Sequence, residues 1–239
     1  MTIKVYNMNN TSVRNNANLK RDIKSLITNN RIYCHNKVTK EYLESAIQDK
    51  TDFLYISYNK YNVPTGFACV GKDYISPKSR FIHLICVQSY MHIRTRSNKR
   101  IHPIHLKGSD LLEHIKKDAI KARCHLIELQ ALDDVITYYY KYGYRFVTHC
   151  NRKEDPSIPK LVKDLYKSRN NPKKKERLLR SRYLTRFLPG RLAEDNLRME
   201  LNEDKLETLI NDGYVMRLCL PSSRNKRSKR TKRKRRSTY

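Results

Sequence analysis

The sequence predicts an α/β fold in which helices flank one mixed β-sheet, and three observations support this. Residues 53–58 (FLYISY) and 66–71 (GFACVG) have the composition of paired strands, and the turn-forming run 62–64 (NVP) separates them. The almost continuous apolar run at 81–87 (FIHLICV) is typical of a central, buried strand. Strand and helix patterns then alternate, as they do in βαβ units.

The remaining elements follow from hydrophobic periodicity and from capping residues. Apolar residues at helical spacing predict helices, and alternating or continuous apolar runs predict strands. Thr39 is a plausible N-cap, and Gly143 fits the C′ position of a helix. In chain order, we expect a strand at 3–7, helices at 19–29 and after Thr39, a basic loop at 88–105, a helix from Ser109, a strand at 126–131, a helix at 133–141 and a strand at 144–148.

A helical insertion is predicted before the last strand. Helix periodicity recurs in the segments 161–167, 177–187 and 205–210, and a clean strand pattern follows at 215–220 (VMRLCL). We therefore expect three parts: a sheet domain made of residues 1–149 and 213–220, a basic helical insertion at 150–212, and a disordered basic tail at 221–239.

The charge of the chain indicates a polyanionic partner. The 239 residues carry 51 Lys and Arg against 23 Asp and Glu, a net charge of +28, and such a surplus favours partners such as nucleic acid. Residues 221–239 hold ten cations and no acid, so this tail predicts a nucleic-acid arm or a nuclear-import signal. Its cations are Arg224, Lys226, Arg227, Lys229, Arg230, Lys232, Arg233, Lys234, Arg235 and Arg236.

Cysteine spacing and hydropathy indicate the cellular compartment in which the protein is expected. The six cysteines are scattered singly with no CxxC pair, which predicts free thiols in a reducing compartment. No run of 18 apolar residues is present, so no membrane span is expected. We expect an intracellular and nuclear protein, or a virion-associated one if the source is viral. The loop histidines lack regular ligand spacing, so no metal is expected.

The order of elements resembles the Gcn5-related N-acetyltransferase (GNAT) fold, and several motifs agree with it. HLKGSDLLEHI (105–115) resembles the pyrophosphate-binding loop and helix of that family. Tyr139, Gly143 and Tyr144 resemble its Tyr-x-x-x-Gly-aromatic ending, and VMRLCL resembles its last strand. The resemblance covers residues 1–149 and 213–220. In the loop pattern, Leu106 and Pro103 replace the first glycine and the Arg or Gln.

The resemblance implies a coenzyme A site at the start of the helix at 109. A glycine before a helix allows close approach to phosphate, and the helix N-terminus offers free N–H groups. The alternative is an ordinary helix start. The residues implied for acetyl-CoA binding are Val87, Lys107, Gly108, Ser109 and Asp110.

The resemblance also implies acetyl transfer to a primary amine by direct attack. Tyr139 matches the general acid of the family, with packing in a tyrosine cluster as the alternative. His83, in the central strand, is a candidate base or else a core histidine, and Glu128 is a second candidate base. The rival function is that of an inactive GNAT-fold protein that binds nucleic acid or chromatin through its basic surface and tail.

Overall fold

The protein was analysed as a computed structural model, which describes residues 2–29, 33–34, 38–72, 78–87, 90–91, 104–105, 108–189 and 203–221. The chain forms two compact units, Met1–Ala122 and Arg123–Tyr239, and each is described by itself. The predicted tail cations and Lys107 lie outside the described residues. In the part of the chain that is described, no helix is long and apolar enough to cross a membrane.

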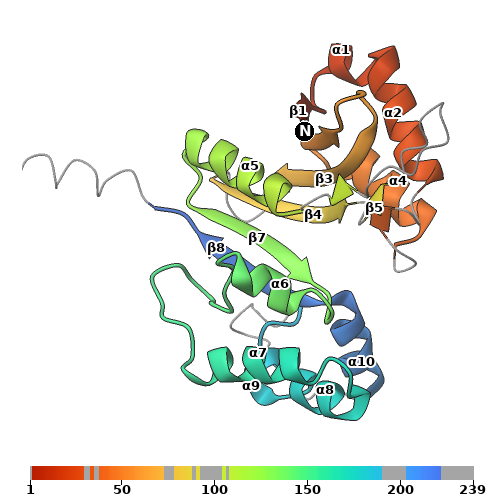
Figure 1. Cartoon of the computed structure of the whole chain (residues 1–239). Helices are drawn as coiled ribbons and strands as arrows, with labels where there is room; N and C mark the ends of the chain where they lie inside the picture. The colour runs from red at the N-terminus through yellow and green to blue at the C-terminus, as the bar shows by residue number, and fades with distance from the viewer. Residues whose placement is uncertain are drawn as a thin grey trace, which may run out of the picture. The chain divides into compact units, whose positions relative to one another are not determined.

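Four antiparallel strands form the sheet of the first unit (Figure 1). They are β1 (Thr2–Asn7), β2 (Phe53–Tyr58), β3 (Pro64–Lys72) and β4 (Ser79–Val87). The expected hairpin of β2 and β3 is present, with Tyr55 opposite Ala68. A short separate ladder pairs β5 (Tyr90–Met91) with β6 (Ile104–His105), in the region predicted as a loop.

The helices of the first unit begin where the sequence offers caps. They are α1 (Thr11–Arg14), α2 (Ala17–Thr28), α4 (Lys40–Asp49) and α5 (Gly108–Lys121). The Asn16 side chain accepts from the N–H of Leu19, and the predicted N-cap Thr39 accepts from the N–H of Tyr42. Buried leucines and isoleucines on α2 and α4 join the inner residues of β2, β3 and β4 in one core.

A chain of hydroxyls connects β1, β2 and α2. The hydroxyls of Tyr6 and Tyr58 lie 3.0 Å apart, and the Tyr58 hydroxyl donates to the Asp22 carboxylate at 2.8 Å. Burial is the main cause that raises the pKa of Tyr58 far above its usual value. This phenol therefore stays protonated and keeps donating to Asp22 at any physiological pH.

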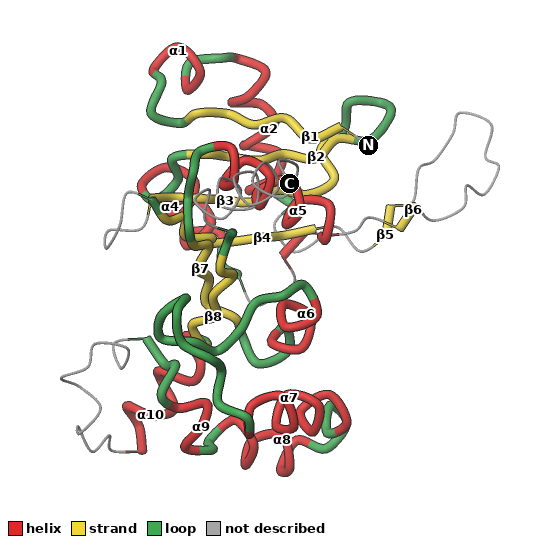
Figure 2. The backbone as a smooth tube through the Cα atoms, turned by 90° about the vertical axis from the view of Figure 1, so that its left-hand side faces the viewer, coloured by secondary structure: helices red, strands yellow, loops and turns green. Residues whose placement is uncertain are grey.

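The second unit joins a strand pair to a group of helices. Strand β7 (Leu126–Ala131) pairs antiparallel with β8 (Tyr214–Cys219), with Glu128 opposite Arg217. The helices are α6 (Ile136–Lys141), α7 (Ser157–Lys167), α8 (Pro172–Leu179), α9 (Arg182–Thr185) and α10 (Glu203–Asp212). Figure 2 shows α7 and α8 side by side, and α7 also packs against α6 and α9.

The predicted α/β class is confirmed, and so is the order of elements from the first strand through the hairpin, α5, β7 and α6 to the closing strand, except for the strand expected at 144–148. This is the order on which the resemblance to the GNAT fold was based. Between residues 150 and 212 the described segments are helical, as expected, and β8 pairs with β7. The three-part division of the chain stays a prediction.

The predicted strand at 144–148 is wrong. Only an isolated bridge between Arg145 and Arg217 occurs there, through backbone bonds of 2.8 and 2.9 Å. Beyond this bridge, side chains satisfy the backbone: the Glu154 carboxylate accepts from the N–H of Phe146, and Arg217 donates to the carbonyls of Val147 and Thr148. The segment thus has strand-like composition without a continuing partner strand.

The expectation of free thiols throughout is also wrong. The structure contains two disulfides, Cys34–Cys86 in the first unit and Cys150–Cys219 in the second, while Cys69 and Cys124 are free and buried. The paired cysteines are 52 and 69 residues apart in sequence. Spacing along the chain could not reveal these pairs, because the fold alone brings such distant residues together.

Candidate active site

The candidate coenzyme-binding residues of the first unit lie at the end of β4 and the start of α5. Val87 ends β4, where it pairs with Gly66 of β3. Gly108 is the first residue of the 14-residue helix α5, which packs against β3 and β4. Val87 and Gly108 therefore belong to two elements that pack together, as the sequence implied.

The start of α5 can receive an anion through its backbone. The first four N–H groups of a helix have no partner within it, and they carry a partial positive charge. Gly108 adds no side chain there, and Ser109 is only half-buried. The Ser109 hydroxyl lies 3.5 Å from the Asp110 carboxylate, an exposed acidic group in the first turn. The amides fit a phosphate group, while the Asp110 carboxylate opposes it.

His83 occupies an irregular position in β4. The register with β3 shifts, so that Cys69 pairs with Leu84 and Val70 with Ile82, which leaves His83 as the extra residue of a bulge. Its ring lies 4.8 Å from that of Phe81. A Cβ added to Gly71 would lie 2.5 Å from the carbonyl oxygen of Lys50 and 2.6 Å from the His83 Nε2, so the backbone and the imidazole both approach this glycine closely.

The environment of His83 keeps its imidazole neutral. Burial and the nearby Lys50 ammonium lower the pKa of His83 to about 4, against the opposing effect of Asp52. A neutral imidazole can accept a proton at pH 7, but a group with so low a pKa is a weak base. The low pKa favours the alternative of a core histidine, and the role of base stays a prediction.

Tyr139 lies on α6 in the second unit and is buried. Its ring is 5.4 Å from that of Tyr138 and 5.7 Å from that of Tyr144. Burial raises the pKa of the Tyr139 phenol well above its usual value, so the group keeps its proton at neutral pH but is a weaker acid than an exposed tyrosine. The hydroxyl of the neighbouring Tyr144 is buried without a hydrogen-bond partner among the described residues.

The turn after α6 holds this tyrosine cluster in place. Gly143 has φ +91°, its N–H donates to the carbonyl of Tyr140, and the N–H of Tyr144 donates to that of Tyr139. These two bonds form a Schellman motif, which confirms Gly143 as the C′ residue. The Tyr-x-x-x-Gly-Tyr pattern therefore has a clear structural role whether or not Tyr139 acts in catalysis.

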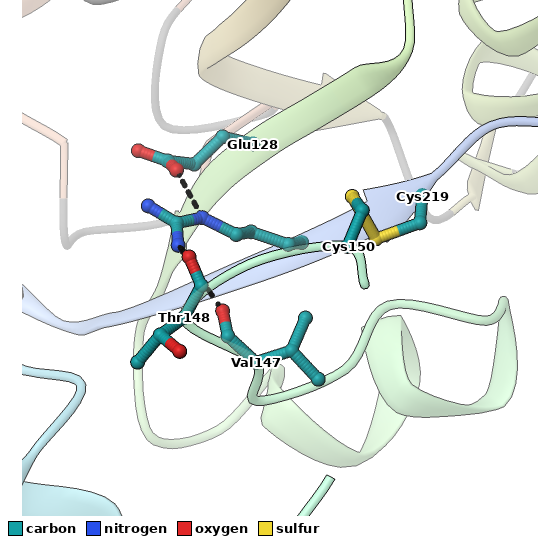
Figure 3. Close-up of a disulfide and its surroundings, with 6 residues drawn as sticks. Glu128, Val147, Thr148, Cys150 and Cys219 are labelled. Carbon is teal, nitrogen blue, oxygen red and sulfur yellow. Dashed lines mark hydrogen bonds and ion pairs between the residues drawn. A yellow bond between two sulfur atoms is a disulfide. The ribbon is translucent and has the colours of Figure 1, made fainter. Parts of the chain in front are cut away.

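Glu128 of β7 is engaged in an ion pair. Its carboxylate accepts from the Nε of Arg217 at 2.6 Å, and the two side chains are only 9% and 11% exposed. In Figure 3 the Glu128 carboxylate lies on one side and the carbonyls of Val147 and Thr148 lie on the other, and the Arg217 guanidinium donates to all three; the same view shows the Cys150–Cys219 disulfide. For Glu128 to act as a base, it would have to do so while paired with Arg217.

Sequence reasoning missed Arg217, which organises this part of the second unit. The signal was present in the sequence, because Arg217 is the one charged residue in the apolar run VMRLCL. A charge within a strand that is otherwise apolar predicts a buried partner. The partner, Glu128, was interpreted as a candidate base, and the two residues were not connected.

The candidate residues thus fall into two groups, one in each unit. His83, Val87, Gly108, Ser109 and Asp110 belong to the first unit, and Glu128 and Tyr139 to the second. In the described residues, no cluster of three or more His, Cys, Asp or Glu is arranged to hold a metal ion.

A groove of ≈ 650 Å³ in the first unit contains none of the candidate residues. It lies against α2 and α4, and cations and acids both line it. The cations include Lys20, Lys24 and Lys40, and the acids are Glu44 and Asp49. This mixed lining assigns no ligand class to the groove.

Comparison with known proteins gives similarity to solved structures only. No family model matches the chain, and no curated protein matches it. Tetrahymena Gcn5 is similar with a TM-score of 0.48 and 12% identity over 92% of this chain and 97% of that one. The catalytic domain of Tetrahymena Gcn5 histone acetyltransferase, in complex with coenzyme A, gives 0.41 and 13% over 64% and 80%.

A third similar structure is aminoglycoside 6'-acetyltransferase type Ii, with a TM-score of 0.40 and 19% identity over 62% of this chain and 84% of that one. Identities this low carry no substrate and no residue's role over to this chain.

Proposed function

We propose that the protein is an N-acetyltransferase that moves an acetyl group from acetyl-CoA to a primary amine by direct attack of the amine. The order of elements supports this proposal most strongly. It is the order that resembles the GNAT fold, and it places Gly108 at the first position of a long helix packed on β4. The helix start is where that resemblance implies phosphate binding.

The steps of the proposed reaction would use groups of this chain. The N–H groups at the start of α5 would bind the pyrophosphate of the coenzyme. The Tyr139 phenol, protonated at all physiological pH values because of its burial, would donate a proton to the leaving sulfur. Acetyl-CoA supplies the acetyl group as a thioester. The proton of the attacking amine would pass to His83, to Glu128 or to water.

Calorimetry with acetyl-CoA tests the binding half of the proposal. The wild type is expected to bind, and Gly108→Glu is expected to abolish binding, because it adds a side chain and a negative charge at the anion site. Lys117→Glu is the control, since it changes the charge more at an exposed position in the middle of the same helix. No heat from the wild type at millimolar acetyl-CoA would contradict the proposed function.

Release of free thiol from acetyl-CoA, measured over a panel of primary amines, tests the chemical half. Tyr139→Phe removes one hydroxyl from a packed ring, so the fold is expected to survive while the rate falls about 100-fold or more. Equal rates for mutant and wild type would remove Tyr139 from the mechanism and leave it as part of the tyrosine cluster.

Nuclear localisation is a separate proposal that rests on the tail cations. A fluorescent protein fused to residues 221–239 is expected to accumulate in nuclei, and a uniform distribution in the cell would contradict the import role.

A further inference from the structure

The helical region of the second unit presents a strongly cationic surface. Between residues 151 and 189, eleven Lys and Arg residues are exposed against one exposed acid, Glu176. The exposed cations are Arg152, Lys153, Lys160, Lys163, Lys167, Arg169, Lys173, Lys174, Arg177, Arg182 and Arg186. The region 150–212 as a whole carries many acids, so this imbalance comes from where the fold places the charges.

Helix α7 directs three lysines away from its packed face. Lys160, Lys163 and Lys167 are separated by three and four residues, so at 100° per residue they form one narrow row. The buried residues of α7 form the opposite face: Ile158, Leu161, Val162 and Leu165. Packing of this apolar face fixes the lysine row outward.

Helix α8 carries a second group of exposed cations. Lys173, Lys174 and Arg177 are exposed, whereas Lys175 turns to another side and forms ion pairs with Asp133 and Asp134 at 2.6 and 2.5 Å. In the described part of the chain, no ion pair engages the three exposed cations of α8 or the lysine row of α7. Their charges are therefore available to an external anion.

Aromatic rings accompany these cations. Tyr166 is 56% exposed on α7, and the Arg169 guanidinium lies 4.8 Å from the centre of its ring. On α9, the Arg182 guanidinium lies 5.1 Å from the ring of Tyr183. An exposed ring that is stacked with arginine is the surface on which an unpaired nucleobase stacks, and neighbouring cations contact the phosphates. A base pair within a duplex does not offer its face in this way.

We propose that the surface formed by α7, α8 and the residues between them binds single-stranded nucleic acid. The lysine row of α7 and the exposed cations of α8 contact the phosphate backbone, and Tyr166 with Arg169 stacks on an unpaired base. Phosphate contacts carry no sequence information, so binding is expected to be tolerant of sequence. This inference rests on the second unit alone and does not depend on acetyl transfer.

The experiment measures fluorescence anisotropy of labelled 20-nucleotide strands with the full chain over a range of salt concentrations. Separate arms use single-stranded DNA, single-stranded RNA and a DNA duplex, all of the same sequence. The tail contributes the same background to every variant. The test variant changes Lys160, Lys163 and Lys167 to Gln. The matched control changes three exposed lysines of the first unit to Gln: Lys60, Lys117 and Lys121.

Loss of three phosphate contacts is expected to reduce the log–log salt slope by about 2, since each contact to a single strand contributes roughly 0.7. Affinity at low salt is expected to fall tenfold or more. The control variant should keep most of its affinity and its slope. Equal losses in the two variants, or no loss in the test variant, would overturn the assignment of this surface.

Tyr166 separates stacking from charge. Tyr166→Ala is expected to weaken single-strand binding about 5-fold or more, because stacking contributes roughly 1–3 kcal/mol per base, whereas Tyr166→Phe keeps the ring and should bind like the wild type. Duplex binding should be the same for all three proteins. If Tyr166→Ala weakened duplex and single-strand binding equally, or neither, the preference for single strands would be wrong. The DNA and RNA arms identify which polynucleotide binds more tightly.

Discussion

Removing one partner of the buried ion pair between Glu128 and Arg217 is expected to destabilise the second unit strongly. Arg217→Met removes the guanidinium and keeps an unbranched apolar side chain. The Glu128 carboxylate, 9% exposed, then stays buried and has lost the guanidinium at 2.6 Å. Breaking a buried pair from one side costs about 3–5 kcal/mol. The carbonyl of Val147 also loses its donor at 3.2 Å, which costs a further 1 kcal/mol or more, roughly.

The magnitude is measurable by thermal unfolding followed by circular dichroism without reductant. At roughly 2–4 °C for each kcal/mol in a chain of this size, Arg217→Met should lower Tm by about 10 °C or more. The double variant Glu128→Leu with Arg217→Met removes both charges, so it should be more stable than Arg217→Met alone. Arg152→Met changes an exposed arginine and serves as the control, with an effect within about 0.5 kcal/mol.

Two results would refute this reasoning. If Arg217→Met lowered Tm no more than the control, the pair would not be buried as the structure has it. If the double variant lost the sum of the two single losses, Glu128 and Arg217 would not be coupled.

Three further predictions concern pH, backbone conformation and cysteine pairing. The pKa of His83 is about 4 in the folded chain, against about 6.5 when unfolded, so the free energy of unfolding should fall by on the order of 2 kcal/mol as pH drops from 6.5 to 4. In urea denaturation at a series of pH values, His83→Gln should make the free energy of unfolding less dependent on pH over this range. An unchanged pH dependence would contradict the burial of the imidazole. Gly213 has φ +99°, and a Cβ there would lie 2.9 Å from the carbonyl oxygen of Ala131. Gly213→Ala should therefore lower the free energy of unfolding, measured by urea denaturation, by about 2 kcal/mol or more, while the control Asn211→Ala, at an exposed position, should be nearly neutral. The Cys150–Cys219 disulfide joins residues 69 apart in sequence, so its reduction should lower the free energy of unfolding by about 4 kcal/mol through loop entropy. Recovery of both cysteines as free thiols in peptide mapping without reductant would exclude the disulfide.

Local signals in the sequence predicted most elements because the structure uses them as expected. Thr39 caps α4 with its side chain, and Gly143 ends α6 with a positive φ. Both effects act within a few residues of the chain, so a sequence pattern contains all the necessary information. The same holds for the strands β2 and β3, whose apolar runs are buried, whereas the apolar run expected to form a buried central strand is the mostly half-buried β4.

Partners that are distant in the sequence could not be predicted. The segment 144–148 has the composition of a strand, but Arg217 and Glu154 satisfy its backbone in place of a neighbouring strand. The cysteine pairs likewise depend on which segments the fold brings together. For the candidate site, the sequence indicated the residue types but not the environment. Burial in the fold, with Lys50 nearby, lowers the pKa of His83, and Arg217 pairs with Glu128; both effects depend on residues far along the chain.

Strand β1 has a protective role that follows from its place at the edge of the first sheet. Among the described strands it pairs with β2 alone; it is mostly exposed and carries Lys4, while β2 is buried along almost its whole length. The six residues of β2, FLYISY, are β-prone and uncharged, which is the signature of an aggregating segment once its edge is open. A shortened chain that begins at Met8 would present that edge to solvent, so it is expected to precipitate or to pair edge to edge with other copies.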